Sequence, residues 1–220
     1  MSNKVACFIP IKTNSERVKG KNFRLLNGKP LYSYIINSAL ESASFDSIFV
    51  DTDSDEIKEY CTALKINTID RQPLLAENTA NGNDLLNYHY SLYSEYDYYF
   101  QLFATAPLLR PETIASCVNS LMSATEKDSI FTAFKECGWF WFENSPVNYN
   151  PESLPRSQDA KMPFKETTGL YGITNESLKK NRCRIGKNPL FFFINEVESL
   201  DIDTEFDFKL AEIIARENKC

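Results

Sequence analysis

Short apolar runs alternate along the chain with longer segments in which apolar residues recur at helical spacing, and this alternation constrains the fold most. Four runs are predicted to form buried strands, at residues 5–9, 47–50, 98–103 and 129–134. Four segments have the helical period, at residues 31–40, 55–64, 84–93 and 114–122. The alternation predicts an α/β protein with a mainly parallel sheet that is covered by helices on both faces.

Residues 137–167 interrupt this pattern and are predicted to form an inserted arm on the sheet, called the arm below. The stretch contains four prolines and four consecutive aromatic residues, Trp139 to Phe142, and it has no helical period. The α/β pattern resumes at residues 168–173. A closing helix is predicted over residues 204–216, with Thr204 as its N-cap and Asp207 three residues later.

Composition bounds the remaining possibilities. The 220 residues fit one domain, residues 1–220, and the net charge of -6 argues against a broad nucleic-acid-binding face. No apolar run approaches the ~20 residues of a membrane span, and no signal peptide is apparent, so a cytoplasmic protein is expected. The six cysteines include no CxxC pair, which predicts free thiols rather than zinc ligands or disulfides.

Against this acidic background, residues 9–22 (IPIKTNSERVKGKN, the basic segment below) carry four basic residues and one acid. The segment follows a predicted strand, so it is expected at the carboxyl edge of the sheet, where ligands of such sheets bind. Gly20 permits a turn, and Lys21 can deliver an ammonium group to a phosphate, although Asn22 stands where a Walker A sequence needs Ser or Thr. The pattern predicts either a site for a small anionic ligand or a solvated basic loop.

Five motifs, in order, resemble those of the acylneuraminate cytidylyltransferase family, the CMP-sialic acid and CMP-Kdo-type synthetases. They are IPIKTNSERVKGKNFRLLNGKPL, VDTDSDEI, DRQPLLAENTANGNDLL, TAPLLRPETI and ESLDIDTEFDF. The resemblance spans nearly the whole chain. It implies a single Rossmann-like nucleotidyltransferase domain with a small dimerisation arm at residues 137–167, and therefore a homodimer.

The activity implied by this resemblance is metal-dependent transfer of CMP from CTP to an acidic sugar, with release of pyrophosphate, for polysaccharide or glycan biosynthesis. The resemblance assigns nucleotide binding to five residues: Lys12, Ser15, Lys21, Asn22 and Arg71. Lys21 is expected to act on the phosphates and to face solvent. Lys12 stands where the family has arginine, so the compact ammonium charge of lysine replaces a planar guanidinium that can make bidentate contacts. For Arg71, a surface ion pair is the structural alternative.

Asp201 and Asp203 are the predicted metal ligands and, with Lys21, the predicted catalytic residues. On an extended strand, residues two apart face the same side, so both carboxylates can meet one Mg²⁺ (or Mn²⁺) while Ile202 packs inward. Solvated loop acids are the alternative for an isolated D-x-D. We expect Asp207 to complement the charge of the helix N-terminus. Asp53 could either support the site or cap the helix that follows it, and the cap is the expectation.

The acceptor pocket departs furthest from the family. Phe103 stands where the family has a glutamine, and Gln101 is the candidate substitute. The resemblance also places Thr105, Arg156 and Gln158 at the acceptor. The single histidine, His89, is expected to be structural.

Three other functions remain open from the sequence. A cytidylyltransferase could act on a phosphonate or a sugar phosphate. A glycosyltransferase also uses a D-x-D motif but has no need of the basic segment. The substitutions at Lys12, Glu16 and Phe103 also suit a non-catalytic nucleotide-binding homologue.

Overall fold

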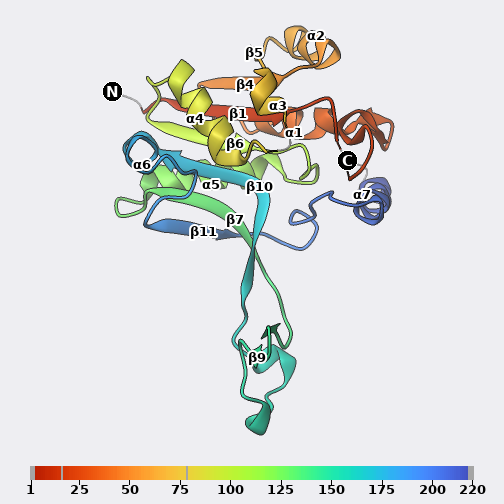
Figure 1. Ribbon diagram of the computed structural model, residues 1–220, viewed down its shortest axis with the longest axis vertical. Helices are drawn as coiled ribbons and strands as arrows, with labels where there is room; N and C mark the ends of the chain where they lie inside the picture. Colours follow the sequence, from red (N-terminus) through yellow and green to blue (C-terminus); the bar gives the residue numbers. More distant parts are fainter. Residues whose placement is uncertain (1–2, 16, 78, 218–220) are drawn as a thin grey trace.

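A seven-stranded sheet forms the centre of the molecule (Figure 1). The computed structural model describes residues 3–15, 17–77 and 79–217. In spatial order the strands are β11 (Pro189–Phe193), β7 (Ser129–Lys135), β10 (Phe164–Thr174), β6 (Tyr98–Leu102), β1 (Val5–Ile11), β4 (Ser47–Thr52) and β5 (Asn67–Asp70). All neighbouring pairs are parallel except the two that involve β10. The predicted mainly parallel α/β sheet is confirmed.

Helices cover both faces of this sheet, as predicted (Figure 1). They are α1 (Leu31–Glu41), α2 (Asp55–Ala63), α3 (Pro73–Ala76), α4 (Gly82–Leu92), α5 (Pro111–Ser123), α6 (Asn175–Asn181) and α7 (Glu205–Glu217). Shorter elements are η1 (Lys21–Phe23), η2 (Pro151–Ser153), η3 (Ser157–Asp159) and two hairpins, β2 (Leu25–Leu26) with β3 (Lys29–Pro30) and β8 (Trp141–Phe142) with β9 (Ser145–Pro146). Each predicted strand and helix corresponds to one observed element.

Two apolar clusters hold the helices to the sheet because strand side chains alternate between its faces. One face of β1 packs with α1, α2 and α5, through residues such as Ile9, Ile36 and Ile114. The opposite face packs with α4 and α6, where Phe8 and Leu86 are buried. A third cluster, which includes Ile202, holds α7 and the segment before it.

Because β1, β4 and β6 run in parallel, their carboxyl ends meet at one edge of the sheet. The basic segment leaves β1 at this edge, Asp53 follows β4, and Phe103 follows β6. The fold therefore brings together three stretches that are far apart in the sequence.

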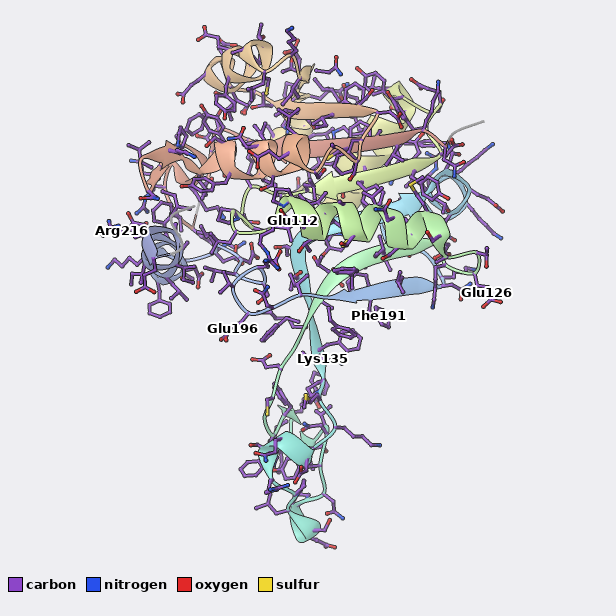
Figure 2. The ribbon with its side chains drawn as sticks, turned by 180° about the vertical axis from the view of Figure 1, so that it is seen from behind. Glu112, Glu126, Lys135, Phe191, Glu196 and Arg216 are labelled. Carbon is purple, nitrogen blue, oxygen red and sulfur yellow. The ribbon has the colours of Figure 1, made fainter. Side chains whose placement is uncertain are left out.

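The arm projects away from the sheet between the carboxyl end of β7 and the start of β10 (Figure 1). Asn148 organises it: its amide nitrogen donates to the carbonyls of Gly138 and Lys161, and its amide oxygen accepts from the Phe140 N–H, each at 2.8 Å. Lys135 lies at the base of the arm, with its ammonium group 4.4 Å from the centroid of the Phe193 ring (Figure 2).

The five cysteines that the structure describes are free thiols, in agreement with the prediction, and Cys220 lies outside the described residues. Across those same residues, no helix has the length and apolar character that a membrane crossing demands.

Candidate active site

The basic segment is shaped by its own backbone and by one acid from β4. Gly20 adopts a φ of 62°, in the left-handed region that favours glycine, and the turn delivers Lys21 and Asn22 into η1. The Asn22 amide donates to the Lys12 carbonyl at 2.8 Å and closes the loop. Asp53 accepts hydrogen bonds from the Thr13 N–H and hydroxyl, at 2.7 and 2.8 Å.

The prediction that Asp53 caps the next helix is therefore wrong. The N-cap of α2 is Ser54, whose hydroxyl accepts from the Ile57 N–H. Asp53 lies one position too early for that hydrogen bond, so its carboxylate is free to fix the start of the basic segment instead.

A cavity of about 340 Å³, the loop cavity, opens beside the basic segment. All five residues predicted to bind nucleotide line it, namely Lys12, Ser15, Lys21, Asn22 and Arg71. Thr105 and Phe103, which follow β6, line its opposite wall. The structure thus gathers the predicted nucleotide residues around one space, and their roles in binding stay predictions.

Lys21 lies deeper than expected, because only 8% of its surface is exposed. Its ammonium group donates to the Ile202 carbonyl and lies 4.0 Å from Asp203 Oδ1. Burial lowers the Lys21 pKa, and the nearby Asp203 and Asp201 oppose this shift. The expectation that Lys21 faces solvent is wrong, since the segment that carries both acids packs over it.

Asp201 and Asp203 flank Ile202, which is fully buried as predicted. The segment is not part of the sheet, but the Ile202 N–H donates to the Thr105 carbonyl at 2.8 Å, and this bond holds it beside β6. Both acids line a second cavity of about 750 Å³, the acidic cavity, together with Glu166 and Asp207.

The two carboxylates differ in their partners. Asp203 forms an ion pair with Arg17 of the basic segment at 2.8 Å. Asp201 Oδ1 is buried without a hydrogen-bond partner, an unsatisfied state that ligation of a cation relieves. Among residues 3–15, 17–77 and 79–217, no group of three or more His, Cys, Asp or Glu residues is arranged to hold a metal, and the metal-binding role of Asp201 and Asp203 stays a prediction. Mg²⁺ is commonly held by one or two carboxylates plus substrate phosphates, and the pair fits that pattern.

The carboxylate of Asp207 accepts hydrogen bonds at the start of α7, including one from the Asp203 N–H at 3.1 Å. Its carboxylate accepts from the Thr204 N–H at 2.7 Å, while the Thr204 hydroxyl accepts from the Asp207 N–H at 3.2 Å. The predicted N-cap of Thr204 with Asp207 is confirmed.

Arg71 is held by a buried acid that the sequence reading missed. Its Nε donates to Asp51 Oδ1 at 3.0 Å, and His89 Nε2 lies 2.8 Å from the other carboxylate oxygen. Asp51 and His89 are fully buried. Burial lowers the His89 pKa, and for Asp51 the hydrogen bonds from His89 and Arg71 outweigh burial and lower its pKa. The Arg71 ion pair is therefore internal, and His89 is structural, stacked on Phe8 at 4.7 Å.

A second buried acid, Glu198, fixes the stretch that leads to Asp201. It accepts from the Arg110 backbone and side chain at 3.1 and 3.0 Å, from the Thr113 hydroxyl at 2.6 Å and from Asn195 at 2.7 Å. Burial raises the Glu198 pKa, but these hydrogen bonds outweigh it, and the net pKa lies below its ordinary value.

The predicted acceptor residues do not assemble within one chain. Gln101 is fully buried, and its amide nitrogen donates to the Gly82 carbonyl at 3.0 Å while its amide oxygen has no partner. Arg156 and Gln158 are exposed in the arm, where Arg156 pairs with Asp159 at 2.6 Å. Only Thr105 lines the loop cavity.

Three residues missed by the sequence reading lie at this site: Asp51, Arg17 and Arg184. Asp51 carried a usable signal, since an acid inside an apolar strand needs a buried partner. Arg17 stands in the first family motif, but the resemblance assigned it no role. Arg184 had no signal, because it follows α6 in an irregular stretch and reaches the site only through the fold.

A family model described as cytidylyltransferase matches residues 6–218. Among curated relatives, N-acylneuraminate cytidylyltransferase A of Danio rerio is 26% identical over 96% of this chain and 50% of its own. Pseudaminic acid cytidylyltransferase of Campylobacter jejuni is 27% identical over 96% of both chains. The chain spans about half the length of the N-acylneuraminate cytidylyltransferases it matches.

Solved structures share the fold. A CMP:2-keto-3-deoxy-manno-octonic acid synthetase complexed with CTP superimposes with a TM-score of 0.70 at 18% identity, over 98% of this chain and 100% of the other. The 4-diphosphocytidyl-2C-methyl-D-erythritol synthase of Anaerococcus prevotii gives a TM-score of 0.72 at 10% identity, over 97% and 96%. At these identities the likeness shows the fold alone.

Proposed function

This chain belongs to the cytidylyltransferase family, and on that premise we propose that it transfers CMP from CTP to an acidic sugar and releases pyrophosphate. The acceptor class is an acylneuraminate or a related 2-keto-3-deoxy sugar acid, used for surface polysaccharide or glycan biosynthesis. Two curated relatives that carry acylneuraminate and pseudaminic acid in their names support this class.

One observation carries the proposal: the loop cavity gathers five nucleotide-binding candidates beside an acid pair at the carboxyl edge of the sheet. Lys21 lies between the two groups, bonded to the Ile202 carbonyl and 4.0 Å from Asp203. Positive groups of the basic segment suit a triphosphate, and the acids suit a cation bound with it.

In the proposed reaction an acceptor hydroxyl attacks the α-phosphorus of CTP and loses its proton to solvent, while the bond between that phosphorus and the oxygen of the leaving pyrophosphate breaks. Catalysis then depends on positioning and on stabilisation of charge at the phosphate oxygens. Lys21 supplies a positive charge that is already fixed by its bond to Ile202. Arg71, fixed by Asp51, and Asn22, fixed on the Lys12 carbonyl, hold the nucleotide.

Asp201 and Asp203 would hold Mg²⁺ (or Mn²⁺), which when bound supplies charge neutralisation at the phosphates. The unpartnered Asp201 Oδ1 and the partly exposed Asp203 are both available for this. Arg17 has to give up its ion pair with Asp203 when the cation binds, and it is free to turn toward the phosphates.

We also propose a homodimer joined through the arm. Three of the four side chains in its aromatic run 139–142 are exposed, with Trp139 at 46%, Trp141 at 56% and Phe142 at 72%. Exposed aromatic clusters of this kind mark interfaces. A dimer is also the arrangement in which Arg156 and Gln158 reach an acceptor, since the arm points away from the site of its own chain (Figure 1). Light scattering that gives a stable 25.3 kDa monomer would refute the dimer.

The test of the function is a product assay with CTP, Mg²⁺ and a panel of N-acetylneuraminate, 2-keto-3-deoxy-manno-octonate, pseudaminate, a phosphonate and a sugar phosphate. We expect pyrophosphate release and a CMP-linked product by mass spectrometry with at least one acidic sugar. Products formed only with the phosphonate or the sugar phosphate would make that compound class, and not the acidic sugars, the acceptor. Nucleotide binding without any product would favour the non-catalytic homologue.

A further inference from the structure

Arg184 contacts one lining residue of each cavity, and no motif of the sequence marks it. Its guanidinium carbon is 5.7 Å from the centroid of the Phe103 ring, which lines the loop cavity. Its Nη2 is 3.6 Å from Glu166 Oε1, and Glu166 lines the acidic cavity. The guanidinium is therefore next to the walls of both cavities.

A rigid platform supports the Arg184 side chain. The guanidinium lies over the Tyr171 ring, 3.6 Å from its centroid, in a cation–π contact. The Tyr171 hydroxyl donates to Glu166, and Tyr171 is almost completely buried, so the ring is held in place. The Arg184 N–H of the backbone donates to Asn83 at 2.9 Å and anchors the residue to α4.

Gly82, the first residue of α4, makes room for the guanidinium. A Cβ at this position would come 2.4 Å from Arg184 Nη1, closer than real side chains pack. The absence of a side chain lets the guanidinium approach the N-terminus of α4, where the helix dipole also favours an anion.

The guanidinium donates no hydrogen bond to any other residue within the described ranges. Its nearest acid, Glu166, is 3.6 Å away, which is too far for a hydrogen bond. Glu166 already accepts from Tyr171. Arginine carries five N–H donors in a planar fork that matches a carboxylate. Here the fork forms an ion pair with Glu166 at 3.6 Å, and none of its donors makes a hydrogen bond to another described residue.

We propose that Arg184 binds the carboxylate of the acceptor and determines the preference of this enzyme for acidic acceptors. The proposal rests on the proposed function. Glu166, which lies 3.6 Å from Arg184 Nη2, lines the same cavity as Asp201 and Asp203. An acceptor held at Arg184 therefore lies next to the wall of the cavity that contains the acid pair. The proposal places the residue that binds the acceptor's carboxylate in the main body of the chain, whereas the family resemblance points to Arg156 in the arm.

The experiment compares binding of each acid with binding of its methyl ester, by calorimetry in the presence of Mg²⁺ and a non-hydrolysable CTP analogue. The acids are N-acetylneuraminate, 2-keto-3-deoxy-manno-octonate and pseudaminate. Wild type is expected to prefer at least one acid over its ester. In Arg184→Gln the acid is expected to bind roughly 10–100-fold more weakly, the value of one charge-assisted pair, and the preference is lost.

Two further variants separate this role from a structural one. Arg182→Gln is the matched control, since this exposed arginine lies two residues earlier and stacks over Tyr90 instead, 5.5 Å from its centroid. It should bind the acid as wild type does. Gly82→Ala displaces the guanidinium and should weaken acid binding in the same direction as Arg184→Gln. Binding of the CTP analogue, measured in the same samples, reports that each variant is folded.

The outcomes separate the two proposals. If the acid binds in an Arg184-dependent manner but no transfer to it occurs, the inference stands and the proposed function fails. If Arg184→Gln keeps the preference for the acid over its ester, the inference is overturned while transfer by the wild type sustains the function. If none of the acids binds the wild type, the inference is overturned as well.

Discussion

The proposed nucleotide side of the site, around Lys21 and Arg71, and the proposed acceptor side, around Arg184 and Arg156, differ in how their charged groups are held. On the nucleotide side, Arg71 is locked by Asp51 in a fully buried ion pair, and Lys21 is bonded to the Ile202 carbonyl. On the acceptor side, Arg184 rests on an aromatic ring with no hydrogen bond to hold its guanidinium, and Arg156 is exposed in the arm. The nucleotide side is therefore organised before any ligand arrives. The acceptor side is left to be completed by the acceptor and, in our proposal, by a second subunit.

The largest expected effect lies at the boundary between the two sides. Asp201→Asn should lower turnover by about 10³-fold, because a neutral amide is a poor ligand for a hard cation whose charge is worth several kcal/mol. EDTA should silence the wild type, and Mg²⁺ should restore it. Asp55→Asn, at an exposed acid on α2, is the control and should keep full activity. Activity that persists in chelator would remove the acid pair from the mechanism.

Lys21→Ala tests the nucleotide side itself. We expect turnover to fall by about 10²–10³-fold, the usual cost of one preorganised charge at the reacting group. Lys19→Ala changes an exposed lysine of the same segment and should alter turnover by less than about twofold. Steady-state rates on variants with wild-type circular dichroism give the comparison. Near-normal rates in Lys21→Ala would show that the basic segment does not act on the phosphates.

Because the charged groups of the two sides are held with different rigidity, we expect substitutions on the two sides to differ in their cost to the free energy of unfolding. Asp51→Asn leaves the buried Arg71 without its counter-charge and should cost about 3–5 kcal/mol in the free energy of unfolding. Glu166→Gln, the equivalent change on the acceptor side, affects a partly exposed acid and should cost less than about 1 kcal/mol. Urea denaturation measures both. Equal costs would mean that the two sides are not built differently.

The smallest expected effect concerns the stability of the fold at low pH. The folded-state pKa of Glu198 lies below its ordinary value of 4.5, so its hydrogen bonds stabilise the fold above that pH. This stability is lost as the pH falls through the folded-state pKa. The free energy of unfolding of Glu198→Gln should therefore depend less on pH below about 4.5 than that of the wild type. Glu196→Gln, an exposed neighbour, should follow the wild type; identical slopes for wild type and Glu198→Gln would contradict the assignment.

The two sides also differ in how far the sequence predicted them. The residues predicted to bind nucleotide stand in continuous motifs: Lys12 and Lys21 follow the predicted strand β1, whereas Arg71 follows β5, and all three line one cavity. The sheet and the cap of α7 follow from local patterns in the same way. The strands β5 and β11 were missed, because β5 has a single buried residue and β11 lies at the sheet edge without alternation.

The sequence could not predict how deeply a side chain is buried or which residues far apart in the chain contact each other. Lys21 was expected in solvent, since nothing local indicates that residues 201–203 pack over it. Arg184 follows α6, and its contacts Phe103, Tyr171 and Asn83 come from the stretch after β6, from β10 and from α4. No spacing rule connects these elements. The contacts therefore depend on the tertiary fold.

The most direct test of a preformed nucleotide side is calorimetric titration with CTP and UTP in Mg²⁺ without acceptor. A site that reads cytosine pairs with its 4-amino donor and its N3 and 2-carbonyl acceptors, so uracil leaves at least two buried groups unpaired. At about 1–3 kcal/mol each, CTP should bind at least roughly tenfold more tightly than UTP. Equal affinity for the two nucleotides, or no binding of CTP until an acceptor is added, would contradict the account.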